Sequence, residues 1–220
     1  QTIDGGYLIT GQKSIDDLHY IWLIKTNNNG DLTWEKSYGG GIYDSGYSVL
    51  ETTDGGYIIT GNIDIPGHST DIWIGKTDIE GNLFWADTLG GISFDLSHSI
   101  QETNDGNYII IGSTYSMGAG GYDAYVVKIN SEGYVLWDNT YGGNYDDKGY
   151  SIVESIDGTT FTFCGQTNSY GSTSFDAWIV QIDSEGNELH NYKIGGNNIE
   201  LTYGINLVED GGFIITGETS

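Results

Sequence analysis

Short apolar runs, each bounded by glycine or acidic residues, recur along the whole chain. One type is apolar on consecutive positions, as in Tyr57-Ile58-Ile59 and Tyr108-Ile109-Ile110-Ile111. Such a run is typical of a strand that is buried on both faces between neighbouring sheets. A second type carries one large aromatic residue at its centre, as at Trp73 and Trp178. Helical periodicity is found nowhere in the sequence, so the pattern predicts an all-β chain of short strands.

The stretch Asp54-Gly55-Gly56-Tyr57-Ile58-Ile59-Thr60-Gly61 returns four more times. Close copies begin at Asp4, Asp105, Asp157 and Asp210, at spacings of 50, 51, 52 and 53 residues. A fixed period in this range indicates stacked or radially arranged repeats. The repeat therefore decides the fold prediction before any local motif does.

Each repeat contains four strand-like segments, which we call A to D. In one copy segment A covers Gly46 to Thr52, segment B covers Tyr57 to Thr60, and segment C covers Asp71 to Thr77. Segment D carries a tryptophan, Trp85 in this copy, and ends in a glycine pair. The Asp-Gly pair between A and B and the pair Glu80-Gly81 between C and D favour tight hairpins, because positive φ is open to glycine.

Four short antiparallel strands per repeat predict a β-propeller, since one such sheet cannot bury both faces alone but a ring of sheets can. We expect one domain over residues 1–220, with about five blade positions, seventeen strands and incomplete terminal blades. The aromatic residues of segments C and D are expected to fill the space between blades. Because the chain opens and closes inside a repeat, we expect it to be part of a longer protein. The expected boundaries are 1–37 for a partial B-C-D blade, 38–88, 89–140 and 141–193 for full blades, and 194–220 for a partial A-B blade.

Charge and composition narrow the possible partners. The 31 acidic and 7 basic residues give a formal net charge of −24, which argues against nucleic acid and anionic membrane surfaces as partners. Cys164 is the one cysteine, so no intrachain disulfide can form, and its apolar strand predicts a small buried hydrophobe. The sequence shows neither a signal peptide nor an apolar run near 18 residues, so we expect no membrane insertion.

The connections between segments B and C differ from repeat to repeat and are rich in serine, threonine, asparagine, glycine and tyrosine. Variable loops on a repeated scaffold commonly bind ligands, and this composition suits hydrogen bonding and stacking on sugars or peptides. Solvated loops without a ligand are the alternative. The four loops are Gln12 to His19, Asn62 to Thr70, Ser113 to Tyr122 and Gln166 to Phe175, and the candidate ligand-binding aromatics in them are Tyr115, Tyr122, Tyr170 and Phe175.

An acidic residue stands four positions after each glycine pair. The four residues are Asp44, Asp95, Asp147 and Glu200. Each precedes the innermost strand of a blade, so the four would surround the mouth of the central channel. Converging carboxylates suit a hard cation with oxygen ligands. Ca²⁺ is the one cofactor that this pattern suggests. Alternatively, each carboxylate accepts hydrogen bonds from backbone N–H groups within its own glycine-rich loop. The metal and the hydrogen-bonding interpretations apply equally to the acids that begin segment C, which are Asp71, Asp123 and Asp176.

Catalytic motifs find little support in the sequence. It contains no nucleophile elbow, phosphate-binding loop or Cys-x-x-Cys pair. Carboxylate pairs for glycoside hydrolysis could be assembled from any acid-rich propeller and are uninformative by themselves. The histidines occupy unrelated repeat positions, and they are His19, His68, His98 and His190.

The run from Trp137 to Ile152, followed by the Asp-Gly turn and the Thr-Gly end of segment B, resembles the β-propeller repeats of large secreted and surface proteins of bacteria and archaea. The resemblance covers essentially the whole chain. Its shared features are the glycine pair, the following acid, the Asp-Gly turn and the Thr-Gly pair, in fixed order. The run Glu80 to Trp85 is also similar to the outer strand of quinoprotein blades, but nothing matches a quinone site. The first resemblance implies a non-catalytic, secreted or surface module with adhesive or scaffolding roles.

We therefore expect an extracellular or cell-surface module that binds a protein or a glycan without chemistry of its own. Two alternatives remain open at this point. One is a glycoside hydrolase or lyase that uses acids at the channel mouth, in which case Asp95→Asn or Asp147→Asn would abolish turnover. The other is a structural spacer or self-assembling subunit, which would show a mass in solution above the 23.9 kDa of the monomer.

Overall fold

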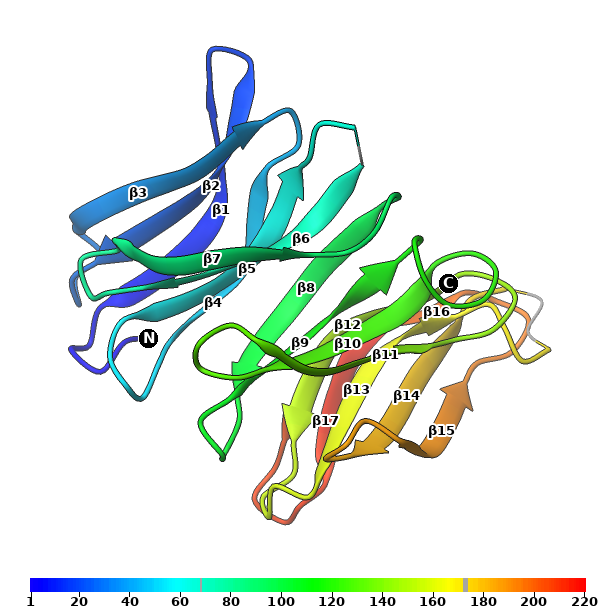
Figure 1. The fold of residues 1–220 in the computed structure, drawn as a ribbon. Coiled ribbons are helices and arrows are strands. Elements are labelled where there is room, and N and C mark those ends of the chain that lie inside the picture. Colours follow the sequence, from blue (N-terminus) through cyan, green and yellow to red (C-terminus); the bar gives the residue numbers. More distant parts are fainter. Residues whose placement is uncertain (68, 172–173) are drawn as a thin grey trace. The chain divides into compact units, whose positions relative to one another are not determined.

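The computed structural model describes residues 1–67, 69–171 and 174–220, and every regular element in these residues is a β-strand (Figure 1). His68 and two residues of the fourth loop between segments B and C, Ser172 and Thr173, lie outside the described residues. No helix that could cross a membrane occurs in the described part of the chain.

Five antiparallel sheets follow one another along the sequence. The first contains β1 (Tyr7–Ile15), β2 (Leu18–Thr26) and β3 (Leu32–Gly41), and the second contains β4 (Ser45–Glu51), β5 (Tyr57–Asp64), β6 (Thr70–Thr77) and β7 (Leu83–Leu89). The third contains β8 (Asp95–Glu102), β9 (Tyr108–Thr114), β10 (Asp123–Ile129) and β11 (Val135–Tyr141), and the fourth contains β12 (Asp147–Glu154), β13 (Thr160–Thr167), β14 (Asp176–Asp183) and β15 (Glu188–Ile194). The fifth pairs β16 (Glu200–Leu207) with β17 (Phe213–Thr219). These strands confirm the predicted all-β fold of four-stranded antiparallel blades with incomplete first and last sheets.

The chain divides into two compact units, Gln1–Ile100 and Gln101–Ser220. In the first unit, aromatic side chains fill the space between the sheet of β1–β3 and the sheet of β4–β7. The rings of Tyr38 and Trp73 stack with centroids 5.5 Å apart, and those of Trp34 and Tyr57 lie 5.8 Å apart. Ile21 is completely buried in the same cluster. The aromatic residues of segments C and D therefore pack between blades, as predicted.

The second unit repeats this packing between the strands β9–β11 and the sheet of β12–β15. Tyr141 of β11 lies 5.3 Å from Phe163 of β13, whose ring meets the edge of Trp178 at 5.4 Å. On the outer side, Trp137 donates its indole N–H to the backbone oxygen of Ser184 at 3.0 Å. Burial of such large rings supplies much of the stabilisation of a small β-domain.

The free cysteine is buried in the second unit, as predicted. Cys164 packs with Val153 and Ile205 in an apolar cluster. Burial raises the pKa of its thiol to about 11, which outweighs a lowering hydrogen bond with Thr202. A thiol in this state is not a nucleophile near neutral pH, so cysteine chemistry is excluded at this residue.

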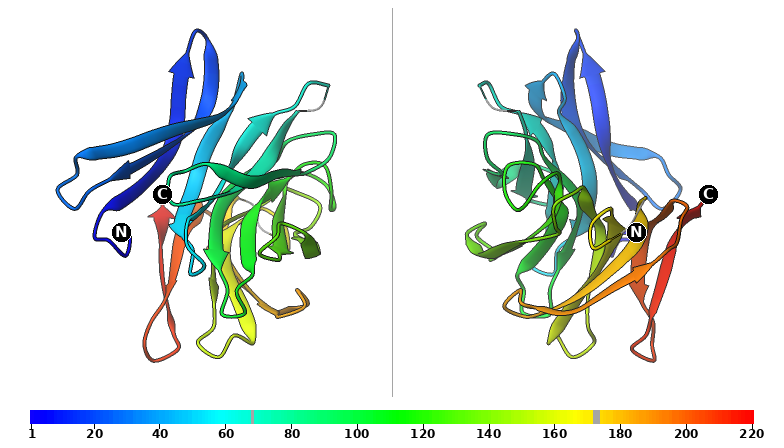
Figure 2. Two further views of the ribbon diagram at one scale, coloured as in Figure 1. Left: turned by 60° about the vertical axis from the view of Figure 1, so that its left-hand side comes forward. Right: turned by 90° about the vertical axis from the view of Figure 1, so that its right-hand side faces the viewer.

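The first connection between segments B and C differs from the prediction. The structure continues both strands through Gln12 to His19 and leaves only Asp16 and Asp17 as the turn, with φ values of 49° and 66°. Aspartate tolerates this left-handed conformation, and such a two-residue turn matches the twist of a hairpin. The hairpin of β1 and β2 consequently extends past the neighbouring strands of its unit (Figure 2).

The first strand of a blade contains a β-bulge. In the pairing of β4 with β5 the register shifts between Gly46 and Ser48, which leaves Tyr47 as the extra residue. The same shift leaves Tyr150 as the extra residue in β12 and Tyr203 in β16. A bulge re-aims a side chain relative to the regular alternation of a strand. Each of these three strands therefore has a tyrosine at its bulged position, outside the regular pairing register.

Candidate functional site

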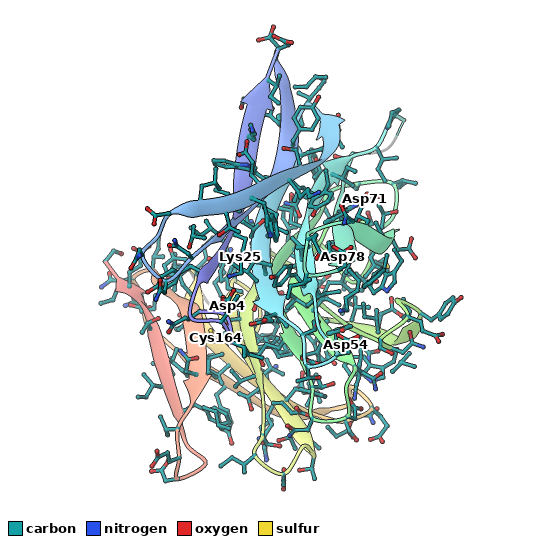
Figure 3. The ribbon with its side chains drawn as sticks, turned by 90° about the vertical axis from the view of Figure 1, so that its left-hand side faces the viewer. Asp4, Lys25, Asp54, Asp71, Asp78 and Cys164 are labelled. Atoms are coloured by element: carbon teal, nitrogen blue, oxygen red, sulfur yellow. The ribbon has the colours of Figure 1, made fainter. Side chains whose placement is uncertain are left out.

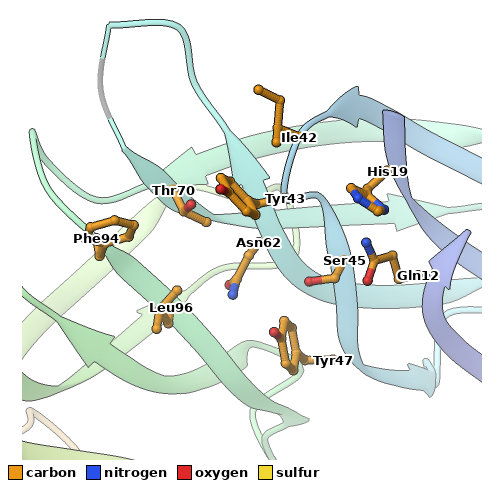
Figure 4. Close-up of a pocket in the computed structure, with 10 residues that line it drawn as sticks. All are labelled: Gln12, His19, Ile42, Tyr43, Ser45, Tyr47, Asn62, Thr70, Phe94 and Leu96. Atoms are coloured by element: carbon orange, nitrogen blue, oxygen red, sulfur yellow. The ribbon is translucent and has the colours of Figure 1, made fainter. Parts of the chain in front are cut away.

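A cavity of about 430 Å³ opens in the first unit (Figure 4). Its polar lining residues are Gln12, His19, Ser45, Asn62 and Thr70, and its apolar lining residues are Ile42, Tyr43, Tyr47, Phe94 and Leu96. His19 and Gln12 lie at one side of the cavity in this view, and Phe94 and Leu96 lie at the other. Ring faces combined with neutral hydrogen-bonding groups suit a sugar-like ligand.

The repeat explains how these side chains meet. Gln12 and Asn62 both follow the glycine that closes segment B, so they occupy the same position in successive repeats. Tyr47 is the bulged residue of β4, and the bulge gives its ring a place in the lining. Equivalent positions of neighbouring repeats therefore supply the two amide groups of the cavity, and the bulged position supplies one of its aromatic rings.

Asn62 is oriented by its neighbours. It is 4% exposed, and its Oδ1 accepts hydrogen bonds from Ser97 N at 2.9 Å and from Ser97 Oγ at 3.3 Å. An asparagine amide has one oxygen acceptor and one NH₂ donor group. With the oxygen held by Ser97, the NH₂ group is the part of Asn62 that can donate to a ligand.

His19 contributes the imidazole of the cavity lining. It lies on β2 opposite Ser14 of β1, and Ser14 Oγ and His19 Nδ1 are 2.8 Å apart. Because Nδ1 is engaged by the serine, Nε2 is the ring nitrogen left for a ligand or a water molecule. The described residues that line the cavity include no other imidazole and no carboxylate. The sequence placed His19 in a variable loop but gave no signal of its role, because its repeat position is not shared.

Asp44 stands between two lining residues but faces away from the cavity. Its side chain is fully buried, and it accepts hydrogen bonds from Gly40 N at 2.8 Å, Gly41 N at 3.0 Å and Asp64 N at 2.8 Å. Its two carboxylate oxygens are taken up by these three backbone N–H groups, and Asp44 is not among the residues that line the cavity. The carboxylate holds the glycine-rich loop instead.

The other three acids that follow a glycine pair make bonds of the same kind. Asp95 accepts from Gly91 N at 2.7 Å and Glu200 from Gly196 N at 3.1 Å. Asp147 accepts from Gly143 N at 2.7 Å, from Ser169 Oγ at 2.7 Å and from the Thr167 hydroxyl group. No group of three or more histidine, cysteine or acidic side chains suited to a metal occurs among the described residues. The calcium site stays a prediction, and the hydrogen-bonding alternative has a direct geometric basis.

One carboxyl group of the second unit titrates unusually. Burial raises the pKa of Asp123 to about 6, opposed by a hydrogen bond from Ala119 N at 2.7 Å and reinforced by the charge of Asp147. A Cβ at Gly142 would clash with both carboxylates, so the two acids lie against the same glycine. Both acids are almost completely buried, at 1% and 0% exposure. Burial of both side chains leaves no contact with solvent through which a substrate could reach this pair of acids.

Asp123→Asn is expected to stabilise the protein at pH 7 by about 1 kcal/mol, after allowance for solvent screening. The folded protein holds this proton up to a pH of about 6, while the unfolded chain releases it near pH 4. Stability therefore falls between these values in the wild type, and asparagine removes that loss. Urea unfolding at pH 4 and at pH 7 measures the difference, with the exposed Glu132→Gln as a control for the change in charge. A variant less stable than the wild type at pH 7 would contradict the argument.

The predicted ligand-binding aromatics do not form one site. Tyr115 and Tyr122 meet edge to face with ring centroids 5.1 Å apart. Tyr170 instead donates its hydroxyl group to Gly142 O at 2.8 Å and has a left-handed φ of 58°. Phe175 uses its backbone oxygen to accept a hydrogen bond from Glu200 N. The structure thus brings the first two residues together and gives the other two roles in loop structure.

Buried lysines are a recurrent feature that sequence reasoning missed. Lys25 is 5% exposed and lies 2.8 Å from Asp4, the acid of the Asp-Gly turn (Figure 3). The equivalent pairs are Lys76 with Asp54 and Lys128 with Asp105, each at 2.8 Å. Burial opposes ionisation of Asp105, but hydrogen bonds from Lys128 and a threonine outweigh it and hold the pKa of Asp105 well below its usual range. The signal was present in the repeat, because lysine occupies one position of segment C in three copies.

Comparison with known proteins identifies the fold but no family. No family model and no curated protein sequence matches the chain. The chain is similar to the solved structure of the periplasmic gluconolactonase PpgL of Pseudomonas aeruginosa, with a TM-score of 0.54 and 12% identity over 93% of this chain. The chain spans 59% of that protein. A second solved structure is described as "putative exo-beta-1,3-galactanase" from Bifidobacterium bifidum s17 and matches with a TM-score of 0.47 and 11% identity. The match covers 96% of this chain and 86% of the galactanase chain.

These matches correct one prediction. The expected function was a non-catalytic module for binding or adhesion, whereas the similar solved structure with the TM-score of 0.54 is named a gluconolactonase, which is an enzyme. At this identity the likeness establishes the propeller-type fold and leaves the reaction to be argued from the site. The chain is therefore a propeller-type all-β protein that is similar in fold to a periplasmic gluconolactonase.

Proposed function

We propose that this chain is a carbohydrate-active hydrolase that acts on a neutral, sugar-derived ester or lactone. The observation that supports this most directly is the cavity of Figure 4, where one imidazole and one oriented amide donor lie among aromatic side chains. The similar structure with the name gluconolactonase makes lactone hydrolysis the first reaction to test. A working place outside the cytoplasm, secreted or periplasmic, belongs to the same proposal.

The chemistry requires only groups that the cavity holds. Nε2 of His19 takes a proton from a water molecule as the water oxygen attacks the acyl carbon. The carbonyl oxygen gains negative charge, and the NH₂ group of Asn62 is the donor that stabilises it. The bond from the acyl carbon to the ester oxygen then breaks, and His19 returns the proton to that oxygen. One water molecule is consumed, and an acid and an alcohol result.

The aromatic lining and the charge of the protein set the class of substrate. Tyr43, Tyr47 and Phe94 offer ring faces to the apolar face of a sugar ring. A formal net charge of −24 repels polyanionic substrates at long range. A neutral ligand with several hydroxyl groups fits both conditions better than a polyuronate, the usual target of a lyase.

His19→Asn is expected to lower kcat about a hundredfold, since general acid–base catalysis contributes at least that much. Acid release from glucono-δ-lactone and from acetylated neutral sugars, followed with a pH indicator, measures the rate. His190→Asn is the matched control, because this exposed histidine of β15 lies outside the cavity. No wild-type turnover above the spontaneous rate, or full activity in His19→Asn, would refute the proposal.

A further inference from the structure

The second unit carries two bulged tyrosines close together. Tyr150 of β12 and Tyr203 of β16 are the extra residues of their strands. Their ring centroids lie 5.6 Å apart with the planes inclined by 52°. Tyr203 is 48% exposed, so one face of this pair is open to solvent.

Both rings are held in place through their hydroxyl groups. Tyr150 donates to Gln166 Oε1 at 3.1 Å, and Tyr203 donates to Glu218 Oε1 at 2.9 Å. Burial raises the pKa of Tyr150 to about 12, so this hydroxyl group keeps its proton over the physiological range. The carbonyl oxygen of Gln166 is thereby occupied, which leaves its NH₂ group as a donor.

The arrangement repeats the one found in the cavity of the first unit. Gln166 and Glu218 each follow the glycine that closes segment B, the position that Gln12 and Asn62 hold in the first unit. Tyr150 and Tyr203 hold the same bulged position as Tyr47, which lines the cavity of the first unit. The same two repeat positions therefore bring an aromatic ring and a polar side chain together in both units.

We propose that Tyr150 and Tyr203 form a second carbohydrate-binding site, which holds one sugar ring of a neutral glycan. The C–H face of the sugar packs on the exposed tyrosine face, and its hydroxyl groups bond to the side chains after the glycines. The site binds without catalysis, because the one histidine of the second unit, His190, lies on the outer strand β15. This inference goes beyond the proposed function, because the second site would bind a glycan without hydrolysing it.

The electrostatics favour a neutral sugar over a charged one. Glu218 accepts the Tyr203 hydroxyl group and has a second oxygen for a sugar hydroxyl group. A carboxylate at the edge of the ring pair repels sulfated or uronic sugars. A quaternary ammonium ion would be drawn to the same rings by cation–π attraction, but it would leave the donor group of Gln166 without a role.

Saturation-transfer NMR and calorimetry with neutral hexasaccharides of glucose, mannose and galactose test the site. Tyr203→Ala is expected to weaken the binding of the best hexasaccharide about fivefold to tenfold, the loss of one aromatic stacking contact. Tyr203→Leu keeps an apolar side chain for folding and is expected to weaken binding as well. Tyr192→Ala is the matched control, because Tyr192 is 55% exposed on β15 of the same unit.

The outcomes separate this site from the proposed active site. His19→Asn should leave binding at the tyrosine pair unchanged, and Tyr203→Ala should leave turnover of a small lactone unchanged. Binding of a hexasaccharide that depends on Tyr203 supports the site even if no turnover is found. Failure of all the hexasaccharides to bind, equal binding by Tyr203→Ala and wild type, or Tyr203-dependent binding of tetramethylammonium in place of sugar would overturn it.

Discussion

Lys76→Ala lowers the free energy of unfolding by about 3 kcal/mol, the expected result for removing a buried lysine that donates three hydrogen bonds and whose aliphatic stem is packed. Lys76 is 3% exposed, and its Nζ donates to Thr52 Oγ1 at 2.8 Å, to Asp54 Oδ1 at 2.8 Å and to Gly55 O at 3.0 Å. Alanine leaves these acceptors without their donor and removes the packed aliphatic stem. The Asp54 side chain is 57% exposed and regains water, so most of the loss arises at Thr52, at Gly55 and along the stem.

The chain itself provides the controls for this experiment. The fourth repeat has Gln181 at the equivalent position, where its Nε2 reaches Thr160 Oγ1 at 3.4 Å. Lys76→Gln should therefore lose less, about 1.5 kcal/mol, because glutamine keeps a donor and most of the stem. Lys36, whose Nζ contacts Asn82 Oδ1 at an exposed site, controls for loss of a surface lysine, and Lys36→Ala should change stability by less than about 0.5 kcal/mol. Urea midpoints measure all three variants, and equal losses in Lys76→Ala and Lys36→Ala would contradict the buried-pair argument.

The fold was predictable because the repeat supplies the same evidence several times. One apolar run such as Tyr57-Ile58-Ile59 fits a buried strand or part of a buried helix equally well. Copies of that run, each followed by an aromatic segment and a glycine turn, leave only a series of antiparallel sheets. The burial of β5, β9 and β13 follows directly, because consecutive apolar residues require cover on both faces.

The site was less predictable because it depends on where the repeats differ. The lining residue His19 owes its place to the extended hairpin of β1 and β2, and that hairpin depends on the turn at Asp16 and Asp17. No other connection between segments B and C has an Asp-Asp pair in its sequence, so the period carried no information about this turn. The bulge at Tyr47 is equally hidden, since a single-residue shift of register leaves the hydrophobic pattern of the strand almost unchanged.

The direction of the acidic side chains was open in the sequence for a different reason. Position in the repeat placed Asp44 beside the inner strand but could not decide between the channel and the loop. The hydrogen bonds of the carboxylate decide it, because both of its oxygens accept from backbone N–H groups and Asp44 does not line the cavity. The backbone N–H groups of Gly40 and Gly41 then have the carboxylate as their acceptor.

Asp44→Asn is expected to lower the free energy of unfolding at pH 7 by about 3 kcal/mol. The buried carboxylate accepts three backbone hydrogen bonds, two on Oδ2 and one on Oδ1. An asparagine side chain must turn its NH₂ group toward at least one of these backbone N–H groups. This change removes a hydrogen bond and places two donor groups, the NH₂ and the backbone N–H, against each other. Glu200→Gln is the matched control, because the equivalent side chain of the last repeat is partly exposed and one of its bonds, to Gly196 N, is longer at 3.1 Å. We expect it to lose only about 0.5 kcal/mol.

The same samples decide between the loop and metal interpretations of these acids. A cation that binds only the folded state at 100 times its dissociation constant adds about 2.7 kcal/mol of stability. We expect wild-type unfolding to be the same in EDTA and in millimolar Ca²⁺, since both oxygens of Asp44 already hold backbone N–H groups. A calcium-dependent shift in the wild type that disappears in Asp44→Asn would mean that the loop releases its carboxylate to a metal. The absence of that shift, together with the large loss of stability in Asp44→Asn, would identify the acid as the residue that shapes the glycine-rich loop beside the cavity.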